Sequence, residues 1–184
     1  MGIGALMKHK AIFLDRDGVL NHVVLKNGKP YPPASVNALT IPADVKTALE
    51  TLKAAGFLLI GATNQPDVAR GTTEKATVEA INSHLLSELP LDEIRVCYHD
   101  DADNCECRKP SPGLLTQAAR ELGIDLTNSV MIGDRWKDIE AGQNAGCKAI
   151  WLDNQYQEKK PLRPDFIATN LTQAAEWIID KYQQ

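Results

Sequence analysis

Two aspartates near the start of the chain are the first residues whose type and spacing suit chemistry. In the segment AIFLDRDGVLN, four apolar residues run directly into Asp15 and Asp17, which are separated by one arginine. Burying an unpaired carboxylate is costly, so two of them at the end of a buried run need a cation or a reacting group beside them. Residues two apart on an extended segment point to the same side. The pair therefore suits a nucleophile and a proton donor that act on one group.

Polar residues also follow three later apolar runs that we expect to be strands. In open parallel sheets, ligands bind beyond the carboxyl ends of the strands, so these residues should converge with the two aspartates. Several carboxylates together need a cation, and an all-oxygen ligand set favours magnesium. A hydroxyl and a lysine beside that metal form a cradle for a phosphoryl group. The residues are Thr63, Asn64, Gln65, Arg108, Lys109, Asp134 and Asp138.

The segment CYHDDADNCEC predicts a second metal site. Three thiols and one imidazole, in two closely spaced pairs, suit tetrahedral zinc. Four protein ligands leave no position open for catalysis, so we expect a structural zinc bound by Cys97, His99, Cys105 and Cys107. Buried free thiols are the alternative. The segment leads directly into Arg108 and Lys109, so the metal could hold these two residues in place.

The elements that must position these residues alternate between strands and helices. Apolar runs predict strands at 11–14, 57–62, 94–97, 130–133 and 148–152, with a short edge strand at 166–168. Helical spacing and end signals predict helices at 44–55, 72–89, 111–122, 135–145 and 171–182. This alternation predicts an α/β, Rossmann-like parallel sheet with helices on both faces.

One segment, 22–41, has no helical period and contains a glycine and three prolines. A connection of this length is usually functional, an active-site flap or a binding loop. Within it we expect residues 25–31 to be a substrate flap, with a surface excursion as the alternative. No block of sequence is large enough for a separate cap domain, which predicts a minimal cap. We expect an N-terminal extension at 1–10 and a single domain at 11–184.

Composition excludes several classes of partner. The 184 residues carry a net charge of -4, which gives no basic surface for nucleic acid or anionic membrane. The sequence has no apolar run that approaches a membrane span, and residues 1–10 do not form a secretory signal. We therefore expect a cytoplasmic protein without nucleic-acid or membrane partners, and a monomer by default.

Four short segments carry a resemblance to a known family. DRDGVLN, TNQ, CRKP and GDRWKDI resemble the four signature motifs of the haloacid dehalogenase-type phosphohydrolases, in the family's order and over residues 11–152. Within that family, the cysteine cluster and the small cap make the sequence most similar to the D-glycero-D-manno-heptose-1,7-bisphosphate 7-phosphatases. Those enzymes act in nucleotide-activated heptose synthesis. Histidinol-phosphate phosphatases are near relatives.

The resemblance implies a role for each motif residue. Asp15 would be the nucleophile that forms an aspartyl-phosphate, and Asp17 the general acid and base. Magnesium would be held by the Asp15 and Asp134 side chains and the Asp17 backbone carbonyl. Thr63 and Lys109 would bind the transferring phosphoryl group. Residues that would reach the small phosphorylated substrate, a sugar bisphosphate, are Asn64, Gln65, Arg70 and Arg108.

The sequence leaves four points open. Arg135 stands where related sugar phosphatases often have lysine, and Asp138 would orient Lys109 or the metal shell. The substrate could instead be histidinol phosphate or another small phosphomonoester. A receiver-like phosphoacceptor domain or a non-catalytic binding module is the alternative of a different class.

Overall fold

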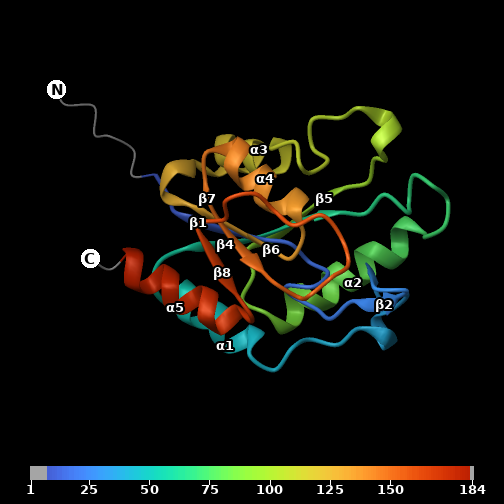
Figure 1. The fold of residues 1–184 in the computed structure, drawn as a ribbon, viewed down its shortest axis with the longest axis horizontal. Helices are drawn as coiled ribbons and strands as arrows, with labels where there is room; N and C mark the ends of the chain where they lie inside the picture. The colour runs from blue at the N-terminus through green and yellow to red at the C-terminus, as the bar shows by residue number, and fades with distance from the viewer. Residues whose placement is uncertain (1–7, 183–184) are drawn as a thin grey trace.

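A computed structural model of the chain describes residues 8–182, which form a parallel sheet between two layers of helices (Figure 1). The strand order is β5-β4-β1-β6-β7-β8, and every neighbouring pair is parallel. This architecture confirms the predicted α/β class, including the edge strand. The strands are β1 (Ala11–Leu14), β4 (Leu58–Asn64), β5 (Glu93–Cys97), β6 (Val130–Gly133), β7 (Lys148–Leu152) and β8 (Phe166–Ala168).

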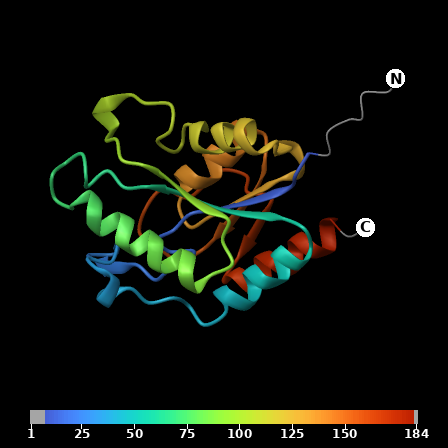
Figure 2. The same cartoon turned by 180° about the vertical axis from the view of Figure 1, so that it is seen from behind.

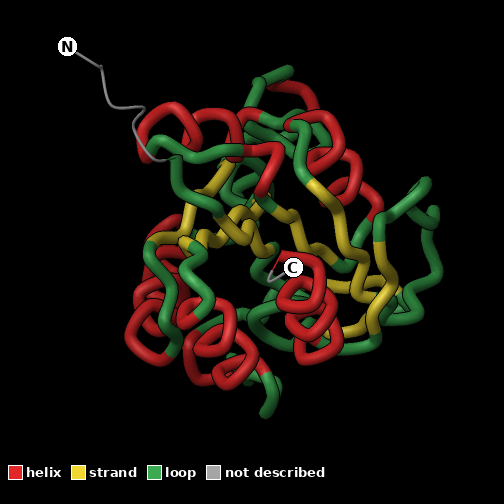
Figure 3. Tube along the Cα trace, turned by 90° about the vertical axis from the view of Figure 1, so that its left-hand side faces the viewer, coloured by secondary structure: helices red, strands yellow, loops and turns green. Residues whose placement is uncertain are grey.

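The helices cover both faces of the sheet, as Figure 3 shows from the side. One face carries α1 (Val45–Ala54), α2 (Lys75–Glu88) and α5 (Leu171–Tyr182). The other carries α3 (Gly113–Leu122) and α4 (Trp136–Ala145). Successive strand residues point to opposite faces, and each layer therefore has its own apolar core.

The central strand β1 anchors the site. Its four side chains are fully buried, with Ile12 and Leu14 in one core and Phe13 in the other. Full burial of each large apolar side chain contributes roughly 1.5–3 kcal/mol to stability. Because the strand is buried on both faces, its sequence is a continuous apolar run. The ladder continues past the strand, because the Asp15 amide donates to the Ile132 carbonyl at 3.0 Å. Asp15 is thus fixed by the sheet itself.

The segment 22–41 contains a small antiparallel hairpin, β2 (Val24–Lys26) and β3 (Lys29–Tyr31), followed by the short helix η1 (Val36–Ala38). Asn27 and Gly28 form its two-residue turn, with φ of 52° and 73°. Asn-Gly favours this turn because both positions need positive φ. The hairpin lies beside α2 at the end of the sheet, in the view from behind as well (Figure 2).

The predicted extension at 1–10 lies in part outside the described residues. Within them, His9 pairs with the 123–125 segment, and Leu58 donates its amide to the Lys10 carbonyl. Backbone bonded to the sheet therefore begins before residue 11. Within 8–182, no helix is long and apolar enough to cross a membrane.

Candidate active site

A buried lysine joins two of the predicted site carboxylates. The Lys109 ammonium lies 2.7 Å from Asp15 Oδ1 and 2.7 Å from Asp138 Oδ1, and it donates to the Ala62 carbonyl at 2.6 Å. Lys109 is only 1 % exposed. Burial lowers the pKa of Lys109, but the carboxylates of Asp138 and Asp15 outweigh burial and the pKa is raised. The lysine is therefore a fixed positive charge beside Asp15, and Asp138 orients it.

Asp134 brings a third buried carboxylate to the same place. One ligand oxygen from each of Asp15, Asp134 and Asp138 lies within 4.8 Å of the others. Burial, and then the charge of Asp138, raises the pKa of Asp15 to about 6 although Lys109 lowers it. Burial and repulsion from Asp15 and Asp138 raise the pKa of Asp134 well above its usual value. One lysine cannot compensate three carboxylates at neutral pH, so the cluster has a deficit of positive charge.

The donor set fits magnesium. Asp134 Oδ1 is buried and has no hydrogen-bond partner among the described residues, while Oδ2 accepts a hydrogen bond from the Tyr156 hydroxyl at 2.7 Å. An orphaned carboxylate oxygen next to other oxygen ligands is what a hard cation requires. The third carboxylate beside Asp15 and Asp134 is that of Asp138. The Asp17 side chain is not part of this carboxylate cluster.

The Asp17 carboxylate is instead held by three neighbours. Arg16 and Asn21 donate to it at 3.0–3.2 Å, and Gln65 Nε2 donates to Oδ2 at 2.8 Å. Gln65 also donates to Thr63 Oγ1 at 2.9 Å, which ties the second predicted motif to the first. These contacts hold the Asp17 carboxylate in one orientation beside Thr63 and the end of β1, which suits a group that gives or takes a proton.

The β4–β5 register brings the third motif beside the second. Asn64 is paired with Cys97 across the two strands. The Asn64 side chain exchanges two hydrogen bonds with the Lys109 backbone, at 3.0 and 3.1 Å. Its amide thus positions Lys109, although the sequence predicts a substrate contact for it. Gln65, another predicted substrate residue, is likewise engaged with Asp17 and Thr63.

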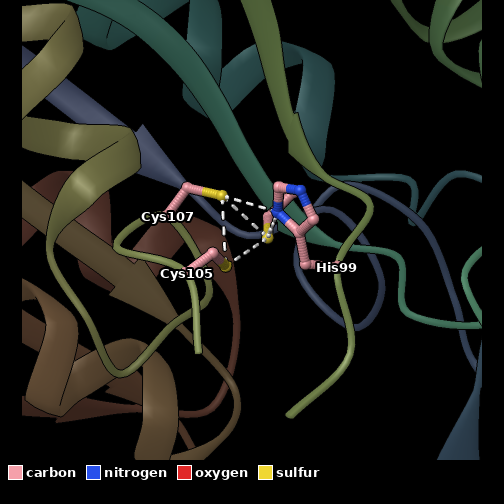
Figure 4. A group of neighbouring side chains, drawn as sticks. His99, Cys105 and Cys107 are labelled. Carbon is pink, nitrogen blue, oxygen red and sulfur yellow. Dashed lines mark hydrogen bonds between the residues drawn. The ribbon is translucent and has the colours of Figure 1, made fainter. Parts of the chain in front are cut away.

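The cysteine cluster gathers as the sequence predicts. Figure 4 shows His99, Cys105 and Cys107 directed at a common point. The Cys97 sulfur lies 3.0 Å from that of Cys107 and 3.6 Å from that of Cys105, and His99 Nδ1 lies 3.3 Å from the Cys107 sulfur. A zinc tetrahedron with bonds of about 2.3 Å has sulfur–sulfur edges of about 3.8 Å. The four side chains therefore fit a zinc ion with little adjustment.

A cleft of about 270 Å³ lies over the strand ends. Asp15, Asp17, Thr63 and Lys109 line its floor, and Arg70, Arg135 and Lys137 line it as well. The β2–β3 hairpin contributes a wall, which supports its interpretation as a substrate flap. The residues of this wall are Val23, Lys29, Pro30, Tyr31 and Pro32.

Arg108 is the predicted substrate residue that does not line the cleft. Its guanidinium donates to Asp101 Oδ1 at 2.7 Å and to the His99 carbonyl at 3.4 Å. The carboxylates of the acidic turn Asp100–Asp101, beside the cysteine cluster, hold the Arg108 guanidinium outside the cleft. Arg70 also binds this turn, and its hydrogen bonds hold the pKa of Asp100 at about 2.

The sequence interpretation missed three residues that hold the site. Arg16 is fully buried and binds both Asp17 and Asn82 of α2, although an arginine between two aspartates reads as a surface residue. Tyr156 binds Asp134 from the loop after β7, which has no motif. Gly18 has a φ of 91°, and a Cβ there would lie 1.8 Å from Asp134 Oδ2. The glycine in DRDG was a usable signal for this close approach.

Replacing Gly18 with alanine is expected to disrupt the carboxylate cluster. The methyl group must displace Asp134, and the positive φ adds strain, so we expect the free energy of unfolding to fall by about 1–3 kcal/mol. Magnesium binding should weaken at the same time. Gly56→Ala is the matched control, because Gly56 has a φ of 88° with nothing within 4 Å of its added Cβ. Equal loss of magnesium binding in both variants, measured by calorimetry, would contradict the steric explanation.

Comparisons with known proteins agree with this geometry. A family model described as HAD-hydrolase-like matches residues 106–174. The D-glycero-β-D-manno-heptose-1,7-bisphosphate 7-phosphatase of Bordetella bronchiseptica is 34% identical over 158 residues, which cover 83% of this chain and 85% of that protein. The D-glycero-α-D-manno-heptose-1,7-bisphosphate 7-phosphatase of Campylobacter jejuni is 35% identical, covering 84% and 87%. The chain belongs to the heptose-bisphosphate phosphatase family.

Membership of this family makes the chain a phosphoric monoester hydrolase of the haloacid dehalogenase type. The fold agrees. A crystal structure of the B. bronchiseptica D,D-heptose 1,7-bisphosphate phosphatase, complexed with magnesium and phosphate, superposes with a TM-score of 0.74 at 28% identity, over 94% of this chain and 99% of that one. The resemblance expected from the four motifs is thereby confirmed.

Proposed function

We propose that this phosphatase removes the 7-phosphate of D-glycero-D-manno-heptose 1,7-bisphosphate through an aspartyl-phosphate on Asp15, in the synthesis of nucleotide-activated heptose. The observation that carries the proposal is the buried cluster of Asp15, Asp134, Asp138 and Lys109, of which Asp15, Asp138 and Lys109 line the cleft. The relatives with this substrate in their names support its identity.

Asp15 supplies the attacking oxygen. The sheet fixes its backbone, and Lys109 holds Oδ1 at 2.7 Å, which leaves Oδ2 as the oxygen that would attack phosphorus. A P–O bond forms to Asp15 as the bond to the sugar oxygen breaks, which leaves a phosphoryl group on the carboxylate. Lys109 and the Thr63 hydroxyl are adjacent donors for the phosphoryl oxygens, and fixed donors of this kind stabilise the charge that develops there.

Asp17 moves the proton. In its protonated form it gives a proton to the leaving sugar oxygen, and as a carboxylate it then takes one from the water that cleaves the aspartyl-phosphate. Arg16, Asn21 and Gln65 hold the carboxylate in one orientation through both steps. The water's oxygen ends on the released phosphate, and Asp15 is regenerated.

Magnesium, when bound, supplies a positive charge that offsets the negative charge of the phosphoryl group and the carboxylates. Asp15, Asp134 and the Asp17 carbonyl would hold it. Asp138 would belong to the surroundings of the metal, because its two oxygens are occupied by Lys109 and by the Arg135 amide.

Basic side chains at the cleft favour a bisphosphate over histidinol phosphate, because they supply donors for a second phosphate. Lys29, Arg70, Arg135 and Lys137 all line the cleft. Arg135 uses Nε and Nη2 for Glu158, and its Nη1 has no partner among the described residues. The second phosphate of a bisphosphate would find donors here, and histidinol phosphate has no second phosphate to use them.

Turnover of a substrate panel tests this function. We expect kcat/KM to be highest for heptose 1,7-bisphosphate, to be at least tenfold lower for histidinol phosphate, and to vanish after removal of magnesium. Both anomers belong in the panel, since relatives of similar identity are named for each. A preference for histidinol phosphate would overturn the substrate, and no phosphate release from any member would overturn the reaction.

Zinc in the cysteine cluster would have a structural role. Cys107 lies two residues before Lys109, so loss of the metal should disorder the lysine. We expect Cys107→Ser to remove zinc, measured by elemental analysis, and to lower kcat by about 10–100-fold at saturating magnesium. Cys147→Ala, which changes a buried thiol outside the cluster, should keep its zinc. Full activity of a zinc-free variant would contradict this role.

We further propose, as predicted from the sequence, a cytoplasmic, monomeric enzyme of one domain. The four cysteines are unpaired, as in a reducing compartment. Sedimentation of the purified protein checks the assembly state, and a dimer at micromolar concentration would contradict it.

A further inference from the structure

A tyrosine outside the four motifs contacts the carboxylate with the orphaned oxygen. Tyr156 lies in the loop between β7 and β8, and its hydroxyl donates to Asp134 Oδ2 at 2.7 Å. Asp134 is 2 % exposed, and its Oδ1 has no partner among the described residues. The hydroxyl therefore occupies one oxygen of the carboxylate and leaves the other for a cation.

Asn154 fixes the direction of that hydroxyl. The amide nitrogen of Asn154 donates to the Gly18 carbonyl at 2.9 Å and to the Tyr156 oxygen at 3.0 Å. A carbonyl only accepts, so the shared atom of Asn154 is its NH₂ group. The Tyr156 oxygen accepts this bond, and its own proton points to Asp134. The hydrogen bonds of Asn154 and Tyr156 thus connect the loop after β7 to Gly18, which follows Asp15 and Asp17, and to Asp134.

The backbone of Asp134 is held by a residue of β7. The Trp151 indole donates to the Asp134 carbonyl at 3.0 Å. With its main chain fixed by Trp151 and Oδ2 fixed by Tyr156, the carboxylate has little freedom to rotate. Rotation would place Oδ1 against the hydroxyl in place of Oδ2, and Oδ1 would then no longer be the unpartnered oxygen.

We propose that Tyr156 is a positioning residue for the magnesium site: its hydroxyl holds Asp134 so that Oδ1 is ready to bind the cation. The inference rests on the proposed magnesium dependence. Partners that orient a ligand typically change metal affinity by 10–100-fold when they are removed. Tyr156 does not line the cleft, so its loss should affect metal binding and not the chemical step at saturating metal.

Metal binding by the free protein tests this role without turnover. Manganese serves as the probe because it shares the oxygen ligands of magnesium, and its binding is followed by electron paramagnetic resonance, with magnesium as competitor. We expect Tyr156→Phe to raise both dissociation constants about tenfold, while kcat at saturating magnesium stays within about twofold of wild type. Asn154→Ala should raise them by a smaller factor. Tyr182→Phe, which removes a hydroxyl from α5, should bind as wild type does.

Three results would overturn the inference. Tyr156→Phe and Asn154→Ala could both bind manganese as tightly as wild type, or Tyr182→Phe could weaken binding equally. Tyr156→Phe could also lose more than tenfold in kcat at saturating metal with unchanged metal binding, which would assign the hydroxyl to the chemical step. If wild type itself bound no manganese, the proposed magnesium site would fail together with this inference.

Discussion

Replacing Asp15 with asparagine is expected to lower kcat by at least about 10⁴-fold, equivalent to about 5.4 kcal/mol of transition-state stabilisation. The amide is a poor nucleophile, so no aspartyl-phosphate can form. Folding should not suffer, because burial and Asp138 already raise the pKa of Asp15 to about 6 and so disfavour its charged form. We therefore expect a magnesium-free Tm equal to or above that of wild type, measured by calorimetry beside the turnover assay.

Asp180→Asn, on the exposed side of α5, is the control for a change from aspartate to asparagine. It should keep wild-type kcat. Activity of Asp15→Asn within tenfold of wild type would mean that another group attacks phosphorus. A strong loss of stability in this variant would mean that Asp15 acts mainly as a structural partner of Lys109.

Replacing Lys109 with methionine should damage both activity and folding. Lys109 is fully buried between two carboxylates, and removal of one partner of a buried ion pair costs about 3–5 kcal/mol because the remaining charge is uncompensated. Loss of a fixed donor to the phosphoryl group should lower kcat by about 10²–10³-fold as well. Urea unfolding and turnover measure the two effects.

A double-mutant cycle separates these effects. Adding Asp138→Asn to Lys109→Met removes one of the stranded carboxylates, so we expect part of the free energy of unfolding to return. Activity should not return, because the phosphoryl donor is still missing. If the double variant is no more stable than Lys109→Met alone, the cost of the single change does not come from uncompensated charge.

The apolar runs predicted the fold because a parallel sheet is buried on both faces. Every strand of the central sheet was predicted from sequence, to within one or two residues at each end. The hairpin in 22–41 was not predicted, since β2 and β3 each span only three residues and most of their side chains are exposed. Its signal was local: the Asn27-Gly28 pair at the turn.

The site was predictable where the chemistry resides at strand ends, and less so where side chains meet across long loops. Asp15 and Lys109 come together because the sheet fixes the Asp15 backbone and Asn64, at the end of β4, holds the Lys109 backbone. Arg108 could have faced either the substrate or the acidic turn at Asp101, and spacing does not decide between two nearby anions. Tyr156 reaches Asp134 from an irregular loop, so no periodicity marks it. Contacts of this kind depend on the loop's path and not on a pattern.

The most direct test of the proposed mechanism is to trap the phosphorylated enzyme during turnover. Borohydride reduces an acyl phosphate to the alcohol, so an aspartyl-phosphate at Asp15 would become homoserine, which peptide mass spectrometry detects. With wild type, magnesium and heptose 1,7-bisphosphate, we predict homoserine at position 15, and none without substrate or in Asp15→Asn. Turnover with no modification at that position, or with the modification at another aspartate, would contradict nucleophilic attack by Asp15.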